Sequence, residues 1–181
     1  MTYCSPIDDL VAAAPQAVQA ALAQRPELVK VGLKGPGVDA WAQNQDIDLP
    51  EALYACLPVG PDGVLARVGA DELMLECSAD EPLLARIEEN LAAPGVYRLD
   101  QQSLTLVLSG PQALAVLAQT CGLEMAREPD NRLVYTRVAG ASCVILPRQE
   151  QGQQVYRLWI DCTQAQYMWE TLSEIIGEFS D

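Results

Sequence analysis

The sequence predicts an α+β fold in which two similar halves, each a split β-α-β unit, place helices on one face of an antiparallel sheet. Two repeated features indicate this class. A strand followed by a Gly-Pro turn and a helix occurs twice, and so does a strand ending in an acid and a cysteine, followed by an amphipathic helix. We expect the two halves to associate with pseudo-two-fold symmetry. The 181 residues are enough to bury about 70% of the surface of the unfolded chain.

The chain is expected to begin with a helical extension, residues 1–27, because this segment is rich in Ala and Gln and places Pro15 where a first helical turn tolerates it. The first α+β repeat follows at 28–95. Alternating and helical apolar periodicities predict its elements. They are a strand at 28–34, a helix at 37–45, strands at 64–68 and 72–77, and a helix at 81–91.

The second α+β repeat is expected at 96–181. The same periodicities predict a strand at 104–109, a helix at 112–121, three consecutive strands at 133–140, 141–148 and 155–162, and a helix at 166–176. Before the first helix of each repeat stands a Gly-Pro pair, Gly35-Pro36 and Gly110-Pro111. We expect the glycine to be the N-cap and the proline to take the first helical position, where its missing N–H costs nothing.

The case for a duplication depends on a second matching pair of segments. Residues 73–77 and 158–162 both read apolar, apolar, apolar, acid, Cys, and the helices that follow them carry apolar residues at equivalent places. A single Gly-Pro turn and an amphipathic helix are common in α+β domains of any kind. Two landmark pairs in the same order favour an internal duplication.

The charge balance excludes several classes of partner. The chain has 11 Lys and Arg against 25 Asp and Glu, a formal net charge of −14. Binding to nucleic acid or to an anionic membrane depends on surplus cations, so neither is expected. The complete absence of histidine also excludes histidine-dependent triads, zinc sites and haem sites, and no metal is expected.

The N-terminus and the cysteines indicate a cytoplasmic protein. The first residues lack the basic region of a secretory signal, and no apolar run is long enough to span a membrane. The six cysteines are scattered singly and have no cationic neighbours that would activate a thiol. They are Cys4, Cys56, Cys77, Cys121, Cys143 and Cys162. We expect buried, reduced thiols that behave as small apolar residues.

No catalytic residue is assigned from the sequence, and cofactor-binding residues stay unassigned. Three groups of acids are candidates for a paired-carboxylate site: Asp8-Asp9, Asp46 with Asp48, and Asp71-Glu72. Solvated turns are the simpler interpretation of all three, and adjacent strand residues point to opposite faces. The glycines at 32, 35 and 37 do not have the spacing of a phosphate-binding loop.

Four residues are candidates for contact with a partner or ligand: Arg137, Tyr135, Trp159 and Trp169. Arg137 lies in an otherwise apolar strand, and its planar guanidinium suits a carboxylate. An arginine in such a strand more often points to solvent or caps a carboxylate than binds a ligand. The aromatics gather between Tyr156 and Trp169, where core packing and interface anchoring are both open.

The ordered motifs resemble a known family. The stretches that carry the likeness are 31–37, Leu49-Pro50, 68–75, 106–111, Thr136-Arg137 and 156–160. Together they resemble the gamma subunit of heterotetrameric sarcosine oxidase, in the wider group related to the glycine-cleavage aminomethyltransferase. The stretch 68–75 is similar to the family's Leu-Gly-Pro-Asp-Glu-Trp-Leu motif, with Ala70 in place of proline and Leu73 in place of tryptophan.

The resemblance implies one compact folate-binding-type domain without an active site of its own. It implies a complex with alpha-, beta- and delta-type subunits that oxidatively demethylates an N-methyl amino acid and passes the one-carbon unit to tetrahydrofolate. FAD, FMN, NAD and tetrahydrofolate would be held by the large partner subunits and zinc by the small delta subunit, so that no cofactor is expected in this chain.

Two alternatives stay open. The chain could be a stand-alone folate-binding or aminomethyltransferase-related one-carbon module, or a structural domain that shares only the fold. If it is a subunit, its less charged half is the expected docking face. Residues 1–90 hold five basic and fifteen acidic residues, whereas 91–181 hold six and ten.

Overall fold

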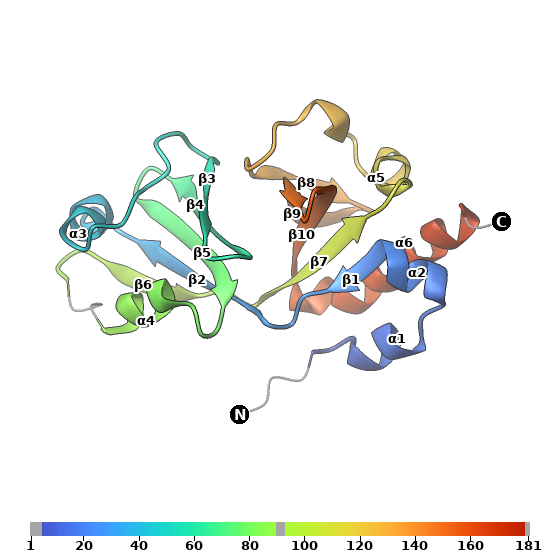
Figure 1. Ribbon diagram of the computed structural model, residues 1–181, viewed down its shortest axis with the longest axis horizontal. Helices are drawn as coiled ribbons and strands as arrows, with labels where there is room; N and C mark the ends of the chain where they lie inside the picture. The colour runs from blue at the N-terminus through green and yellow to red at the C-terminus, as the bar shows by residue number, and fades with distance from the viewer. Residues whose placement is uncertain (1–4, 90–92, 180–181) are drawn as a thin grey trace. The chain divides into compact units, whose positions relative to one another are not determined.

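The structure, a computed structural model, describes residues 5–89 and 93–179. The chain divides into two compact units (Figure 1). One, the split unit, combines the residues up to Pro26 with those from Ser103 onward. The other, the continuous unit, is the single segment from Glu27 to Gln102. Each unit contains one five-stranded sheet in which all neighbouring strands are antiparallel.

The continuous unit has the strand order β3-β4-β5-β2-β6. Its strands are β2 (Leu28–Lys34), β3 (Cys56–Val59), β4 (Gly63–Gly69), β5 (Glu72–Ser78) and β6 (Tyr97–Asp100). Its helices are α3 (Val38–Asn44) and α4 (Pro82–Glu89). Alternate strand residues such as Leu33, Leu73 and Leu75 form a core cluster with Val38 of α3 and Ile87 of α4. The period-two alternation therefore buries one face of this sheet against its helices.

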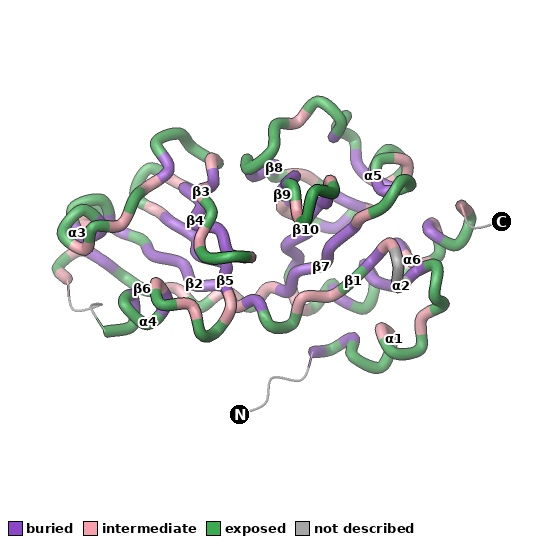
Figure 2. The backbone as a smooth tube through the Cα atoms, in the orientation of Figure 1, coloured by how far each residue is buried: buried purple, intermediate pink, exposed green. Residues whose placement is uncertain are grey.

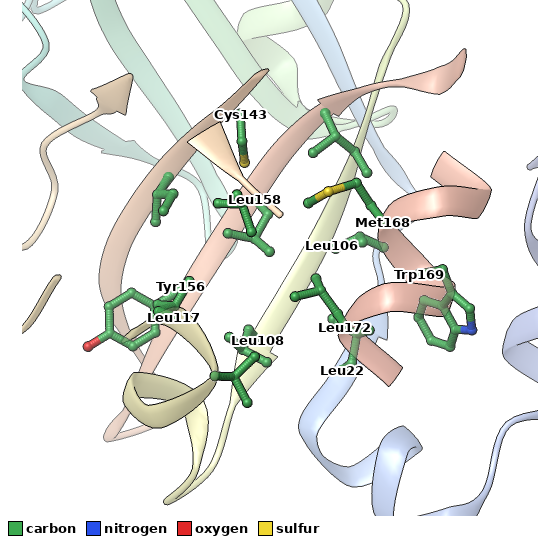
Figure 3. Close-up of a cluster of buried hydrophobic side chains, with 14 of the residues drawn as sticks. Leu22, Leu106, Leu108, Leu117, Cys143, Tyr156, Leu158, Met168, Trp169 and Leu172 are labelled. Atoms are coloured by element: carbon green, nitrogen blue, oxygen red, sulfur yellow. The ribbon is translucent and has the colours of Figure 1, made fainter. Parts of the chain in front are cut away.

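The split unit has the strand order β1-β7-β10-β9-β8. Its strands are β1 (Leu22–Gln24), β7 (Ser103–Ser109), β8 (Val134–Val138), β9 (Ala141–Glu150) and β10 (Gln153–Asp161). Its helices are α1 (Asp8–Ala13), α2 (Gln16–Ala21), α5 (Ala113–Thr120), α6 (Ala165–Glu178) and two 3-10 turns, Met125–Arg127 and Cys162–Gln164. Figure 3 shows its core, where Met168 and Leu172 of α6 lie among side chains from the sheet such as Leu106, Cys143 and Leu158.

The two sheets have the same strand order once the repeats are matched. Four strands match one to one between the units: β7 corresponds to β2, β10 to β5, β9 to β4 and β8 to β3. The remaining edge strand is exchanged between repeats, because β1 precedes β2 in the chain but pairs with β7, and β6 precedes β7 but pairs with β2. The predicted α+β class with an internal duplication is confirmed.

The matched segments 73–77 and 158–162 also have matching faces. Leu73 and Leu158 both belong to their unit's core cluster, as do Leu75 and Ile160 two positions later. The acids Glu76 and Asp161 therefore lie on the opposite face of their sheets. The sequence alignment of the two repeats is in the correct register.

The Gly-Pro turns differ from the expected helix starts. Helix α3 begins at Val38 with Gly37 as N-cap, and α5 begins at Ala113 with Gln112 as N-cap. In both repeats the proline lies in the turn before the helix. The preceding glycines have φ of 126° at Gly35 and 84° at Gly110. Glycine is favoured there because an L side chain rarely adopts these angles, not because it caps the helix.

The N-terminal segment and two edge strands also differ from the expectation. The described part of this segment, residues 5–27, contains two short helices and β1 rather than one helix, because Pro15 precedes α2 as its N-cap and separates it from α1. Strand β6 was not predicted, and although its residues fall in the segment expected as the second repeat, it pairs in the sheet of the continuous unit. Strand β3 was not predicted because Pro58 interrupts its pattern, and such a proline is tolerated at the edge of a sheet.

Burial follows the sheets in both units. Figure 2 shows the central strands as mostly buried and the connecting loops as mostly exposed. Among the described residues, no helix combines the length and the apolar character that a membrane span requires.

Candidate functional site

The split unit presents a second sheet face, opposite the one that packs against α5 and α6. Cross-strand pairing places Thr105, Trp159, Val144 and Tyr135 in one row across this face. The next row contains Val107, Arg157 and Leu146, and Arg148 and Arg137 lie in flanking rows. We call this the arginine face, because three of the chain's arginines lie on it. Charged side chains are rarely buried completely without a specific partner.

The carboxylate of Glu150, at the end of β9, lies close to three arginine side chains at one end of this face. Arg157 Nε donates to Glu150 Oε1 at 2.7 Å, and Arg157 Nη2 lies 2.6 Å from the same oxygen. Arg148 Nε lies 3.4 Å from Glu150 Oε1, and Arg25 Nη1 lies 3.5 Å from Oε2. The Arg157 side chain is fully buried. The chain thus supplies its own carboxylate to three guanidinium groups, two of which, those of Arg157 and Arg25, donate charge-assisted hydrogen bonds to it.

The predicted contact residues divide between the two faces of the sheet. Tyr135, 52% exposed, and the exposed Arg137 lie on the arginine face at the β8 edge, and the buried Trp159 lies on the same face. Trp169, 3% exposed, belongs to the core cluster on the helix side (Figure 3). The structure therefore brings three of the four residues onto one face and leaves two of them accessible.

The other aromatics of the C-terminal region have distinct environments. Tyr156 is buried in the core cluster, and its burial, together with nearby Asp130, raises the pKa of its hydroxyl. Tyr167 is exposed on α6, and its hydroxyl donates to the Ala139 carbonyl oxygen at 2.6 Å, in the β8–β9 turn. Of these two, only Tyr167 offers an aromatic surface to solvent.

The acidic pairs lie in turns and at helix or strand starts. Asp46 and Asp48 are exposed in the loop after α3. Asp71 lies in the β4–β5 turn, whereas Glu72 begins β5 and its Oε2 lies 3.0 Å from Lys34 Nζ. Asp8 and Asp9 occupy the first turn of α1, where negative charge is favourable. These positions are typical of solvated acids and not of two carboxylates that share a proton.

Two of the thiols, Cys77 and Cys143, are in surroundings that suppress ionisation. Burial raises the pKa of Cys143 to about 12, with a smaller contribution from Cys121, and burial followed by Glu81 raises that of Cys77 to about 12. The described cysteines form no disulfide with one another, and Cys162 is the one that is only partly buried; they are Cys56, Cys77, Cys121, Cys143 and Cys162. Cys4 lies outside the described residues. Thiols with so high a pKa are poor nucleophiles near neutral pH.

Two charged clusters were missed from the sequence: the Glu150 group and an ion pair between Lys30 and Glu76 on β2 and β5. Each has a sequence signal, because a single charge stands inside an apolar strand pattern, as at Arg157 between Tyr156 and Leu158. The signal marks a special position but not its partner. Within 5–89 and 93–179, no group of three or more acids or cysteines could hold a metal ion.

The proteins found to be similar to this chain are proteins of known structure. No protein-family model and no curated protein sequence matches the chain. The structure of a heterotetrameric sarcosine oxidase from Corynebacterium sp. U-96, in complex with pyrrole 2-carboxylate, contains a chain with a similar fold. The TM-score is 0.81 at 22% identity, and the match covers 99% of this chain and 97% of that one.

The glycine cleavage system aminomethyltransferase T from Bartonella henselae is also similar, with a TM-score of 0.62 at 18% identity. That match covers 83% of this chain but only 44% of the aminomethyltransferase chain. The expected likeness to both proteins is thereby confirmed for the fold. The chain has the α+β fold that a sarcosine oxidase subunit shares with part of an aminomethyltransferase.

Proposed function

We propose that the chain is a non-catalytic, gamma-like subunit of a heterotetrameric sarcosine oxidase-type complex. In this proposal the complex demethylates an N-methyl amino acid oxidatively and transfers the one-carbon unit to tetrahydrofolate. Alpha-, beta- and delta-type subunits hold FAD, FMN, NAD, folate and zinc, and this chain holds none of them. The observation that carries the proposal is the likeness to a sarcosine oxidase chain over nearly the whole length of both.

The residues of the chain agree with a role that involves no proton transfer. The sequence has no histidine, and burial holds the pKa of the Cys77 and Cys143 thiols near 12. A nucleophile with an adjacent base is therefore not available from these groups at neutral pH.

The docking surface in this proposal is the β8 patch, which we define as Tyr135 and Arg137. Both side chains are exposed and stand two residues apart on one strand, so they point to the same side of the sheet. Tyrosine and arginine are enriched at the energetic centres of protein interfaces. An arginine here suits a carboxylate on the partner, since its guanidinium can donate two parallel hydrogen bonds.

The test is co-expression with the alpha-, beta- and delta-type subunits of such an oxidase from the same source. We expect one complex that contains this chain, and sarcosine-dependent oxygen uptake that falls when the chain is left out. Full uptake without this chain, or a chain that elutes alone, would contradict the proposal.

A pair of charge reversals makes the test specific for the β8 patch. Arg137→Glu should release the chain from the complex. Arg127→Glu makes the same charge change at an exposed position in the same unit, where Arg127 pairs with Glu124 at 2.9 Å. That control should leave the complex intact. Equal effects of the two variants would indicate net charge and not this surface.

The second candidate is a stand-alone folate-binding or one-carbon module, favoured by the likeness to the aminomethyltransferase. The described residues fit it less well at the arginine face. Three guanidinium groups that could otherwise donate to the glutamyl carboxylates of a folate, those of Arg25, Arg148 and Arg157, are directed at Glu150. Calorimetry of the isolated chain with tetrahydrofolate separates the candidates. Binding at about 1 μM, roughly −8 kcal/mol, would favour this second function.

A further inference from the structure

A pocket of about 360 Å³ lies within the continuous unit, between the loop that follows α3, strands β3 and β4, and helix α4. Its principal lining residues are Ile47, Asp48, Leu57, Leu65, Leu83 and Arg86. The volume is within the range of sites for small molecules. None of these residues belongs to the β8 patch or to the Glu150 cluster.

The interior of the pocket is continuous with the core of the unit. Leu65 belongs to the core cluster and is only 3% exposed, and Ile47 and Leu83 pack against the same cluster. An apolar group that enters the pocket would leave water and contact side chains that are already held in place. Burial of such a group is favourable by about 25 cal/mol per Å² of apolar surface.

The loop that forms one wall is held at both of its ends. At its start, the Arg86 guanidinium donates to the Gln45 carbonyl oxygen. At its end, Arg67 Nε donates to the Pro50 carbonyl oxygen at 2.6 Å. Between them, Ile47 N donates to the Ala42 carbonyl oxygen at 3.0 Å. A wall fixed in this way loses little conformational freedom when a ligand binds.

Helix α3 ends in a turn that leads the chain into this loop. Asp46 has φ of 51°, in the left-handed region, and its N–H donates to the Gln43 carbonyl oxygen at 3.1 Å. Together with the bond from Ile47 N to the Ala42 carbonyl oxygen, this is the Schellman motif that commonly ends a helix. The motif fixes the direction in which the loop leaves the helix, and Asp48 follows two residues later.

Two opposite charges line the apolar pocket from separate elements, Asp48 from the loop and Arg86 from α4. A carboxylate recognises an ammonium group, and a guanidinium recognises a carboxylate. We propose that this pocket binds a small zwitterion with an apolar body, of the α-amino acid class. Its ammonium group would lie at Asp48, its carboxylate at Arg86 and its side chain against Leu57, Leu65 and Leu83.

The test is an NMR titration of the full chain, labelled with ¹⁵N, using L-leucine and two analogues. 3-Methylbutylamine has the same apolar group and the amine but no carboxylate, and 4-methylpentanoate has the carboxylate but no amine. We expect L-leucine to shift the pocket amides with a dissociation constant of about 1 mM or lower. Each analogue should bind at least about tenfold more weakly, since it lacks one charged contact.

Variants of Asp48 and Arg86 test which charged group of the ligand each residue binds. Asp48→Asn should weaken L-leucine and the amine but leave 4-methylpentanoate unchanged. Arg86→Gln should weaken L-leucine and 4-methylpentanoate more than the amine, whose affinity can also fall because Arg86 holds the loop through the Gln45 carbonyl oxygen. Arg86→Lys should restore part of the affinity for L-leucine. Asp46→Asn makes the same charge change two residues from Asp48 and should have no effect on L-leucine binding.

Three outcomes would overturn the proposal. The first is the absence of amide shifts at about 10 mM L-leucine, which is at least tenfold above the expected constant. The others are shifts confined to other surfaces, and equal affinity for L-leucine and both analogues. The spectra without ligand show whether each variant is folded. This proposal concerns the isolated chain and does not depend on the subunit function.

Discussion

Lys30 and Glu76 face each other on neighbouring strands of the continuous unit, with Lys30 Nζ 3.4 Å from Glu76 Oε1. The side chains are 1% and 0% exposed. Both charges have therefore lost most of their hydration, and each lies against an opposite charge. In the matching position of the other repeat, Asp161 is exposed and accepts from Thr163 N at 2.8 Å. The duplicated acid is a buried ion-pair partner in one repeat and a surface residue in the other.

The first prediction concerns this pair. Glu76→Gln and Lys30→Met should each lower the free energy of unfolding by about 3 kcal/mol, because one buried charge then lacks its counter-charge. The double variant Lys30→Met/Glu76→Leu should cost much less than the two single changes together. Urea unfolding followed by circular dichroism measures all three. Strictly additive effects would show that the two charges do not stabilise each other.

The free energy of unfolding should also depend on the carboxylate of the Glu150 cluster, which consists of Glu150 with Arg25, Arg148 and Arg157. Glu150→Gln leaves the guanidinium of the fully buried Arg157 without this counter-charge, and we expect a loss of about 3 kcal/mol in the free energy of unfolding. Glu124→Gln is the matched control, because its partner Arg127 is 80% exposed and such pairs contribute about 0–1 kcal/mol. Similar losses in both variants would contradict a special role for Glu150.

Two of the predicted contact residues should respond in opposite ways. Trp169→Ala removes a core side chain and should lower the free energy of unfolding by about 4 kcal/mol. Arg137→Ala changes an exposed side chain and should alter stability by less than about 0.5 kcal/mol while weakening assembly. Thermal unfolding and gel filtration with the partner subunits check these two effects. A stable Trp169→Ala variant that fails to assemble would reverse the assignment.

Each unit has its own core cluster, so the segment 27–102 should fold by itself. The split unit should also fold when Pro26 is joined directly to Ser103, because Arg25 N already donates to the Thr105 carbonyl oxygen at 2.9 Å. We expect dispersed amide spectra and cooperative melting from both proteins. Disordered spectra from both would show that neither cluster is sufficient.

The buried thiols predict a dependence of stability on alkaline pH. The pKa of Cys143 rises from 9.0 to about 12 on folding, chiefly through burial. The native state therefore keeps a proton that the unfolded state loses, and the stabilising contribution is complete below pH 9.0 and is lost as the pH rises toward 12. In this range the loss is about 1.4 kcal/mol per pH unit.

Cys143→Ala isolates this contribution from that of the other groups that titrate at high pH. We expect the free energy of unfolding of the variant to fall less steeply between pH 9 and 11 than that of the unchanged chain, whatever its value at pH 7. Urea titrations at several pH values measure the slope. An unchanged slope would mean that the Cys143 thiol ionises as easily in the native state as in the unfolded state.

Much of the fold could be predicted because local patterns carry it. Alternation identified β2 with its observed bounds, and the three consecutive strands near the C-terminus were found within a few residues. The repeat landmarks also placed Leu73 and Leu158 on equivalent faces. Strand β3 escaped detection because Pro58 breaks the pattern, and β1 because three residues are too few to show a period.

The candidate sites were less predictable because they depend on pairing between distant segments. Arg137 and Tyr135 could be chosen from one strand, since residues two apart share a face. The sequence pattern does not distinguish the surroundings of Trp159 from those of Trp169. In the structure, Trp159 lies on the arginine face and Trp169 lies in the core on the helix side of the sheet. The pocket at Asp48 and Arg86 combines a loop with a helix that lies far along the chain.

The sequence by itself determined the α+β class, the duplication and the absence of histidine chemistry, because these follow from composition and from periodicities within short segments. Only the tertiary structure decided that β1 and β6 exchange partners, that Glu76 pairs with Lys30 and that Glu150 gathers three arginines. The physical reason is that strand partners and buried ion pairs are selected by contacts between residues remote in sequence. A local sequence pattern can indicate that a charged residue is buried, but its counter-charge is known only when the tertiary structure shows which distant residue lies beside it.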